Sequence, residues 1–459
     1  MSPRLSPKQA NTPDCEKRPI SVECISSHVG CTSKAAGWSW RSSAAEWIDL
    51  EARSRCPAAS NLIGHNSRHR VVYSGFAGLA LVNAYPSPDM SAGLKVRERD
   101  MGEEVIIYAQ QQINHLMPSV VETTLDYYPP PCELSAIVTA TIAACDPLDG
   151  KTDGVVSRTD LCMLHFNLSS TIGTAYNCSA SSSSGEGPLR KRATQPAQVG
   201  TVSANGVAVA QAIYDGLHNS YGQRAYLSWQ IGSELSDAET TYDSTTDSWA
   251  LDINSFGGEF VERFVLLRNA SNISSLDGVT YDTLIEWMKT AYVRYLASLQ
   301  TTYPDLTDFE SHGGKLLHYH GESDASVPAA SSVHYWQSVR GIMYPHKTHN
   351  ASLEALAKWY QLYLVPGAGH CGANSLQPDG PYLQDNMATM IDWVENGVQP
   401  TFLNGTIGGG TDEGKIQRLC RWPKRPLWTG NTTQSECVVD EKSLDTWTYK
   451  FPAFKVPIY

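Results

Sequence analysis

The stretches "GGKLLHYHGESDASVP" (313–328) and "WYQLYLVPGAGHC" (359–371) decide the fold. Each is a short apolar run that ends in polar and Gly-rich residues, the pattern typical of a buried strand in a parallel sheet. The segment "NMATMIDWVENG" (386–397) predicts a helix that ends at Gly397. Two such strand units followed by a helix predict an α/β fold with its chemistry at the strand ends.

Asp324 and His370 come just after these two predicted strands. An acid that precedes a histidine fits the chain order Ser…Asp…His of α/β-hydrolases, in which a buried carboxylate fixes the tautomer of the imidazole and stabilises the imidazolium. The alternative is two polar loop residues in an ordinary α/β sheet. We interpret His312, His318 and His320 as packing or surface histidines, since none lies on a Gly turn at a strand end.

The segment "CDPLDGKTDGVVSRTDLC" (145–162) places aspartates among glycines in a tight loop. Ca²⁺ prefers carboxylate and main-chain carbonyl oxygens, and this loop offers three carboxylates and two carbonyls. The predicted ligands are Asp146, Asp149, Asp153 and the carbonyls of Lys151 and Val155. Cys145 and Cys162 bracket the loop and can close it as a disulfide. The alternative is an Asp-Gly turn with a disulfide and no metal.

The composition excludes some classes of partner. The chain has 459 residues, of which 41% are hydrophobic and 18% charged, and its net charge is −12. Such a charge argues against a nucleic-acid or membrane-surface partner, because both are polyanionic. No apolar run is long enough to cross a bilayer. The length suits a large core, or a core with a big insertion.

Sequons and cysteines predict a secreted glycoprotein. The sequons are at Asn167, Asn177, Asn269, Asn272, Asn350, Asn404 and Asn431. The opening "MSPRLSPKQANTPDCEKRPISVEC" has no apolar h-region, so no signal peptide is present in this sequence. The 11 cysteines leave one thiol without a partner inside the chain. A basic run, 190–192, is interpreted as solvated loop charges or as a processing site at Arg192.

Four stretches together resemble the tannase and feruloyl esterase family of secreted fungal ester hydrolases. They are "SGFAG" (74–78), "YYPPPCELSAIVTATIAACDPLDGKTDGVVSRTDLC" (127–162), "GGKLLHYHGESD" (313–324) and "VPGAGHC" (365–371). The resemblance implies an α/β-hydrolase core with a large inserted lid domain, and a core that is incomplete in its N-terminal part. The expected boundaries are core at 1–116, lid with the calcium loop at 117–305 and core at 306–459.

The resemblance also implies roles for individual residues. Asp324 and His370 would be the acid and the base, calcium would be a structural ion, and the backbone of Gly75, Phe76 and Ala77 would line the oxyanion pocket. In the family, the cysteine after the histidine bonds to a cysteine just before the nucleophilic serine. That nucleophile segment is missing here. Its nearest remnant is Ser91 in "DMSAGLKV" (89–96), which leaves Cys371 as an orphan thiol.

Three interpretations of this departure stay open. The chain is an active serine esterase with an altered nucleophile turn at Ser91, a secreted non-catalytic relative that binds aromatic esters or glycans, or an imperfect copy of an esterase with segments misjoined upstream of about residue 115. The last explains the missing signal peptide, the missing nucleophile and the odd cysteine together. The expected substrate is a galloyl or hydroxycinnamoyl ester, such as a plant polyphenol or cell-wall ester.

Spacing also predicts disulfides. Cys145 pairs with Cys162, and Cys420 pairs with Cys437, while pairing of Cys132 with Cys178 is a weaker suggestion.

Overall fold

The computed structural model describes most of the chain after Tyr108. The described ranges are 108–181, 195–296, 303–370, 372–383, 386–430 and 432–454, together with the backbone of four short strands between His69 and Pro86. The predictions for Ser91, Cys371, Ala77 and Arg192 fall outside the described residues.

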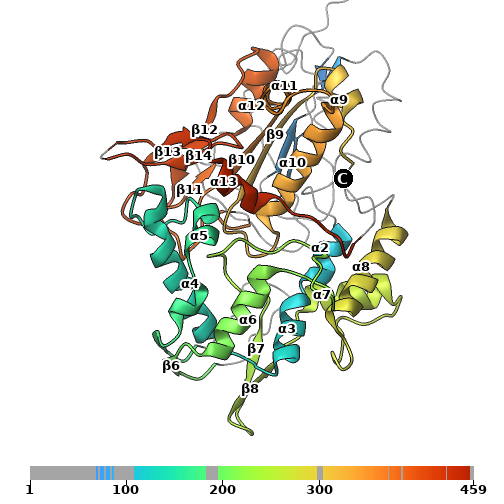
Figure 1. Cartoon of the computed structure of the whole chain (residues 1–459), viewed down its shortest axis with the longest axis vertical. Helices are drawn as coiled ribbons and strands as arrows, with labels where there is room; N and C mark the ends of the chain where they lie inside the picture. Colours follow the sequence, from blue (N-terminus) through green and yellow to red (C-terminus); the bar gives the residue numbers. More distant parts are fainter. Residues whose placement is uncertain are drawn as a thin grey trace, which may run out of the picture.

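The central sheet confirms the two strands predicted from the sequence. Its order is β10-β9-β3-β2, and Figure 1 shows β9 and β10 beside the long helix α10. The strands are β2 (Tyr73–Phe76), β3 (Leu79–Val82), β9 (Lys315–Gly321) and β10 (Tyr360–Val365). β9 and β10 are parallel, with Val365 opposite Gly321, and β3 is antiparallel to both β9 and β2. The carboxyl ends of β9 and β10 therefore meet at one edge.

Helices cover both faces of this sheet. α10 (Ala329–Met343) contacts β9 and β10, α11 (His349–Ala357) contacts β10, and α12 (Asn386–Glu395) contacts β3 and β9. α9 (Thr307–Ser311) precedes β9. The predicted helix at 386–397 is thus confirmed, and it ends before Gly397, whose φ is 69°.

Side chains of β9 alternate between two hydrophobic clusters. Leu316 packs in the larger cluster with Val333 and Trp336 of α10, whereas Leu317 and Tyr319 pack in a second cluster with Met390 and Trp393 of α12. Because successive side chains of a strand point to opposite faces, the even-numbered histidines of β9 face the α10 side.

An antiparallel sheet that the sequence analysis did not predict lies beyond β10. It contains β11 (Pro381–Leu383), β12 (Phe402–Ile407) and β13 (Ile416–Cys420). β14 (Arg425–Leu427) pairs with β15 (Glu436–Val438), and the chain continues into α13 (Glu441–Leu444) and η4 (Asp445–Trp447). The predicted disulfide Cys420–Cys437 is present and joins β13 to β15.

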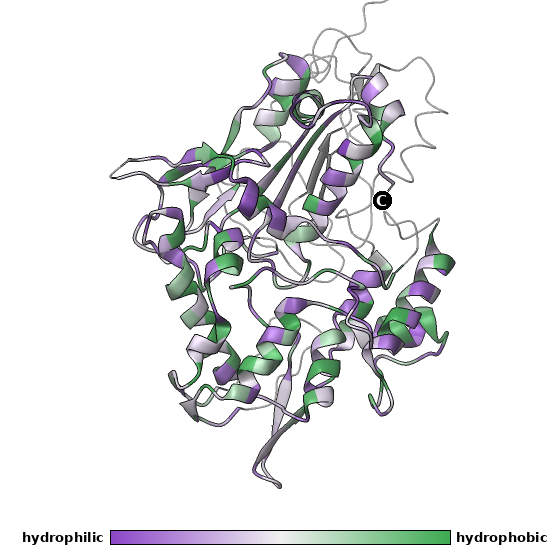
Figure 2. Cartoon of the chain, viewed as in Figure 1, coloured by the Kyte–Doolittle hydropathy of each residue, from purple (hydrophilic) through white to green (hydrophobic). Residues whose placement is uncertain are grey.

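The lid segment (117–305, as predicted from the sequence) is mainly helical and occupies the lower half of Figure 1. In Figure 2 its helices carry both hydrophobic and hydrophilic residues, as expected for helices with one buried and one exposed side. α2 (Tyr108–Asn114) lies just before this segment. The helices of the segment are α3 (Met117–Leu125), α4 (Pro131–Cys145), η1 (Asp146–Asp149), α5 (Thr159–His165), η2 (Leu168–Thr171), α6 (Ala204–Asp215), α7 (Ser255–Phe260), η3 (Val261–Val265) and α8 (Tyr281–Tyr295).

Two short hairpins complete the lid segment. β5 (Ala175–Cys178) pairs with β6 (Gln198–Thr201), and β7 (Thr240–Asp243) pairs with β8 (Ser248–Leu251). Disulfides Cys132–Cys178 and Cys145–Cys162 are both present, as predicted. α4 begins at Pro131, where a proline is tolerated in the first turn. None of the helices described here is long and apolar enough for a membrane span.

Candidate active site

The loops after β9 and β10 are hydrogen-bonded to each other. Glu322 N–H donates to the carbonyl of Val365 at 2.9 Å, and Ser323 N–H donates to the carbonyl of Ala368 at 2.9 Å. A Cβ at Gly321 would collide with the carbonyl oxygens of Ala368 and Gly369, so only glycine permits this approach. The two loops therefore form one rigid unit at the strand ends.

This unit brings the predicted acid and base together. His370 Nδ1 lies 3.0 Å from Asp324 Oδ2. The Asp324 side chain is fully buried, while that of His370 is 32% exposed. An ionised carboxylate only accepts, so His370 carries its proton on Nδ1 when neutral, and Nε2 is the nitrogen that can accept another. This is the arrangement of an acid–base pair in acyl transfer.

Asp324 is held by more than His370. Its Oδ1 accepts from the N–H groups of Ser326 at 2.7 Å and Val327 at 2.9 Å. Its Oδ2 also lies 3.2 Å from His320 Nε2. Burial by itself would raise the pKa of Asp324, but the His370 charge and the hydrogen bonds from His320 and His370 outweigh it and hold this pKa well below its usual range. Asp324 is therefore ionised at neutral pH.

The histidines near β9 differ from the sequence interpretation in one respect. His312 is exposed, and His318 and His320 are buried, which agrees with surface and packing positions. The contact of His320 with Asp324 was not predicted. The sequence places His320 at the carboxyl end of β9, four positions before Asp324. It does not show that the imidazole points toward Asp324, because this depends on where α10 packs.

The predicted oxyanion residues are only partly described. Gly75 and Phe76 lie at the end of β2. Leu79 of β3 pairs with His318 and with Phe76, whereas Val82 pairs with Lys315. The Phe76 end of β2 therefore lies toward the same edge of the sheet as Asp324. The role of this backbone in binding an oxyanion stays a prediction.

In the Asp loop (146–155), carboxylate side chains accept hydrogen bonds from backbone N–H groups of the same loop. Asp146 Oδ1 accepts from Asp153 N–H at 2.9 Å, and Asp149 Oδ1 accepts from Lys151 N–H at 2.8 Å. Burial, with a smaller contribution from the neighbouring Asp153 and Asp146, outweighs the hydrogen bonds with Lys151 and Ser157 and raises the pKa of Asp149 to about 7. Asp149 Oδ2 is buried without a hydrogen-bond partner.

A positive charge is already present in this loop. Lys151 Nζ lies 2.8 Å from Asp153 Oδ2 and 3.0 Å from Asp412 Oδ2. Among the described residues, no three His, Cys, Asp or Glu side chains are grouped closely enough to hold a metal ion. The orphaned Asp149 oxygen and the mutual repulsion of the carboxylates nevertheless fit a bound cation. Calcium binding stays a proposal.

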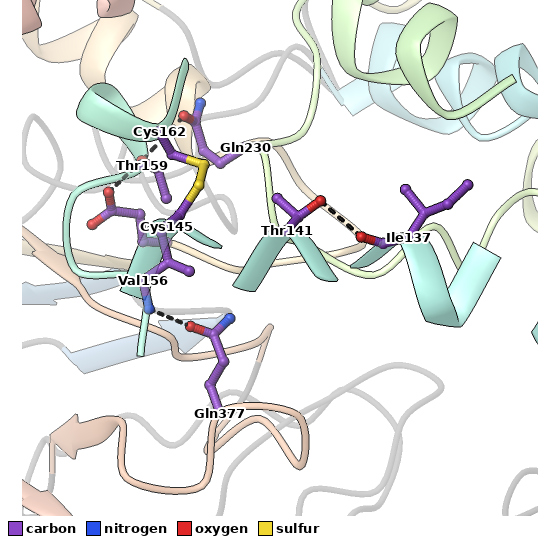
Figure 3. The surroundings of a disulfide bond; sticks show 9 residues. Ile137, Thr141, Cys145, Val156, Thr159, Cys162, Gln230 and Gln377 are labelled. Carbon is purple, nitrogen blue, oxygen red and sulfur yellow. Dashed lines mark hydrogen bonds between the residues drawn. A yellow bond between two sulfur atoms is a disulfide. The ribbon is translucent and has the colours of Figure 1, made fainter. Parts of the chain in front are cut away.

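The segment after the Asp loop contacts the loop that holds Asp324. Figure 3 shows Val156, whose N–H donates to Gln377 Oε1 at 2.8 Å, beside the disulfide Cys145–Cys162. Gln377 Nε2 in turn donates to Ser323 Oγ at 2.7 Å. One buried amide therefore joins the lid segment to the residue that precedes the acid.

A buried ion cluster makes a second connection. Arg425 contacts Glu322 and lies 3.5 Å from Asp160, and Asp160 is bound by Arg158 at 2.9 Å. Thr159 donates to Glu322 at 2.5 Å. These side chains are nearly inaccessible to solvent. The sequence analysis missed this cluster, because its members come from three distant segments.

The family model described as "Tannase and feruloyl esterase" matches residues 102–444. Tannase from Aspergillus oryzae is 63% identical over 373 residues, which are 78% of this chain and 63% of that protein. Probable feruloyl esterase B-1 from Aspergillus oryzae is 31% identical over 307 residues, which are 64% of this chain and 49% of that protein. The chain thus spans less than two thirds of the length of these relatives.

A solved structure gives the same assignment. Tannin acyl hydrolase from Aspergillus niger superimposes with a TM-score of 0.73 and 53% identity, covering 77% of this chain and 62% of that one. The expected α/β-hydrolase fold is therefore confirmed. The family match over most of the chain, and the acid and histidine at the ends of β9 and β10, lead to one conclusion: this chain belongs to the tannase and feruloyl esterase family.

Proposed function

We propose that this protein is a serine carboxylic ester hydrolase that cleaves galloyl or hydroxycinnamoyl esters, such as those of plant polyphenols and cell walls. The observation that carries the proposal is the contact of His370 Nδ1 with the buried Asp324 at 3.0 Å. The names of the relatives, tannase and feruloyl esterase, support the substrate class.

The mechanism follows from the protonation of this pair. His370 Nε2 takes the proton of a serine hydroxyl while the serine oxygen attacks the ester carbonyl carbon. Asp324 stabilises the imidazolium, which then gives its proton to the leaving alcohol as the acyl–oxygen bond breaks. Water releases the aromatic acid by the same steps. Ser91 is the proposed nucleophile, and backbone N–H groups at Gly75, Phe76 and Ala77 would bind the oxyanion.

Active-site labelling tests this function. We expect a fluorophosphonate to label wild-type protein at Ser91, and the label to be lost in His370→Ala and reduced strongly in Asp324→Asn. Label on another serine would replace Ser91 but keep the esterase assignment. A folded chain that takes no label, but binds a galloyl ester, would instead support the non-catalytic relative.

We also propose that the Asp loop binds calcium as a structural ion. The side chains of Asp146, Asp149 and Asp153 and the carbonyls of Lys151 and Val155 would hold it. The buried, partnerless Oδ2 of Asp149 supports this proposal. A bound dication would offset the repulsion among the carboxylates and fix the loop, without acting on the ester. Chelation should lower the melting temperature, and an unchanged temperature together with no bound metal by elemental analysis would refute the site.

Secretion and glycosylation are proposed on the sequons. Asn167, Asn177, Asn269, Asn350 and Asn404 are exposed, so a glycan can be attached to each, whereas Asn272 is half-buried. Asn272 donates to the carbonyl of Ile253 at 2.9 Å. Protein secreted from a fungal host should lose mass on enzymatic deglycosylation, and an unchanged mass would argue against this proposal. Cleavage at Arg192 would give two fragments on a denaturing gel run without reductant, because each disulfide of the described residues lies entirely on one side of that position.

A further inference from the structure

We propose that His320 is a positioning residue for Asp324. A chain of buried hydrogen bonds runs from Tyr360 through His318 and Ser332 to His320, each donor facing the next residue toward Asp324, and this chain fixes the tautomer of His320. The inference rests on the proposed function for the roles of Asp324 and His370. The chain itself is a feature of the described residues between β10, β9 and α10.

The hydrogen bonds of this chain are continuous. The Tyr360 hydroxyl lies 2.9 Å from His318 Nδ1, and His318 Nε2 lies 2.8 Å from Ser332 Oγ. Ser332 Oγ is also 2.7 Å from His320 Nδ1. All four side chains are buried, so each proton in the chain needs a protein acceptor.

The far end of the chain determines its direction. His320 Nε2 lies 3.2 Å from Asp324 Oδ2 and 3.2 Å from the carbonyl oxygen of Val327. Both neighbours accept hydrogen bonds, so Nε2 must carry a proton. In neutral His320, Nδ1 then accepts the hydroxyl proton of Ser332.

The protonation of His320 determines the positions of the remaining protons in the chain. Ser332 has one hydroxyl proton, which is given to His320, so its oxygen accepts from His318 Nε2–H. His318 Nδ1 must then accept the hydroxyl proton of Tyr360. Every donor has an acceptor in this arrangement, and every hydrogen bond points toward Asp324.

The opposite direction is disfavoured. It requires a doubly protonated His320, which would cancel the charge on Asp324, and it makes Tyr360 an acceptor. Among the described residues, the hydrogen-bond partner of the Tyr360 hydroxyl is His318, so its proton would then be left unmatched. Burial lowers the pKa of His318 well below its usual range, helped by His320, and burial raises that of Tyr360. Both are therefore neutral.

The consequence lies at the carboxylate. Oδ2 of Asp324 receives N–H donors from both His320 and His370, while its Oδ1 receives two backbone donors. His320 thereby fixes the rotamer of Asp324, and its N–H stabilises part of the negative charge on the carboxylate oxygen that faces His370. The other charged side chains of this region, Glu322 and Arg425, are paired with each other. His320 acts through Asp324 and does not reach the reacting atoms itself.

The tautomers can be measured without substrate or nucleophile. In protein labelled with ¹⁵N-histidine, two-bond ¹⁵N–¹H correlations at about pH 8 should show His318 and His320 as Nε2–H tautomers, and His370 as the Nδ1–H tautomer. An Nδ1–H tautomer at His318 or at His320 would overturn the proposal. This experiment uses wild-type protein, so it does not depend on the folding of a variant.

A pair of variants tests the positioning role. His320→Leu removes the donor to Asp324, whereas the side-chain amide of His320→Gln can donate to Asp324 and accept from Ser332. We expect the leucine variant to raise the pKa of His370, lowering its acid-dissociation constant roughly three- to tenfold, and the glutamine variant to restore it within about twofold. The same His370 pKa in both folded variants would contradict the role. An inactive wild-type enzyme with the expected tautomers and His370 pKa would refute only the esterase function.

Discussion

The loop that holds Asp324 (322–327) and the Asp loop (146–155) are both rich in buried carboxylate, yet their electrostatics are opposite. Asp324 accepts hydrogen bonds on both oxygens, and its pKa is far below the usual range. Asp149 has one oxygen without a partner, and its pKa is raised to about 7. The first loop therefore stabilises the charge of its carboxylate, whereas the second leaves one buried oxygen of Asp149 without a hydrogen bond.

The largest expected effect is on catalysis. Asp324→Asn keeps the shape of the side chain but removes the charge that stabilises the imidazolium of His370. By analogy with the same change in a serine-protease triad, we expect a loss of about 10⁴-fold in kcat. Hydrolysis of a galloyl ester measures it, with Asp149→Asn as the control that should keep most activity in excess calcium. An equal loss of kcat in both variants would show that the Asp324 loop has no special role in catalysis compared with the Asp loop.

The sequence predicts the first loop well for a physical reason. Short apolar runs specify β9 and β10, and parallel strands must bring their carboxyl ends to one edge, so Asp324 and His370 meet without further information. The contact of Asp324 with His320 depends on Ser332 of α10, a tertiary neighbour that periodicity does not reveal. The disulfides Cys145–Cys162 and Cys420–Cys437 followed from spacing, whereas Cys132–Cys178 was only a weaker suggestion.

Other parts could not be predicted because their causes are not local. The ion cluster of Arg158, Asp160, Glu322 and Arg425 assembles from distant segments. The antiparallel sheet of β11, β12 and β13 consists of short strands whose burial alternates while their polarity does not, since Phe402 and Ile416 are exposed and Gln417 is buried. The domain boundaries and the nucleophile stay predictions, as the residues that would decide the latter lie outside the described part.

The second effect concerns the disulfide that closes the Asp loop. Cys145–Cys162 and Cys420–Cys437 have the same sequence separation of 17, so the chain-entropy model predicts that removing either costs about 3 kcal/mol of unfolding free energy. Double alanine variants and urea unfolding measure this loss. We expect only the Cys145/Cys162 variant to weaken the stabilisation by calcium. Equal calcium responses in both variants would show that the loop is preorganised without its disulfide.

The third effect is a pH dependence of opposite sign in the two loops. Because the pKa of Asp149 is raised from 3.8 to about 7 in the folded protein, this group binds more protons when folded between those values, so its contribution to stability falls as pH rises through this window. Asp324 has a lowered pKa, so its contribution is present above about pH 4 and is lost as pH falls.

Two Asp→Asn substitutions measure the opposite pH dependences of these two contributions to stability. In chelator at about pH 8, Asp149→Asn should increase the unfolding free energy by about 2 kcal/mol, because it removes a buried charge that lacks a partner, and the gain should vanish near pH 4. Asp324→Asn should decrease stability at pH 8 in the same assay. Denaturant unfolding at both pH values measures each change. A loss of stability in Asp149→Asn at pH 8 would mean that its carboxylate is satisfied without a cation.

The smallest effect concerns the cation that the Asp loop already contains. Lys151 lies 2.8 Å from Asp153 and 3.0 Å from Asp412, and its side chain is 26% exposed. Lys151→Met keeps most of the apolar stem and removes the charged Nζ, which lies 4.8 Å from the centroid of the Trp428 ring. For such a partly exposed pair we expect a loss of about 0.5 to 1 kcal/mol in chelator.

Calcium should reduce this loss, because a bound dication would supply the counter-charge that Asp153 loses with Lys151. Unfolding of wild type and Lys151→Met is therefore compared in chelator and in excess calcium, with Lys415→Met as the matched control, since Lys415 also pairs with Asp412 but not with Asp153. The control should lose the same small amount in both solutions. If Lys151→Met also loses equally in both, Lys151 and calcium do not act on the same carboxylates, and the Asp loop balances its charge with lysine alone.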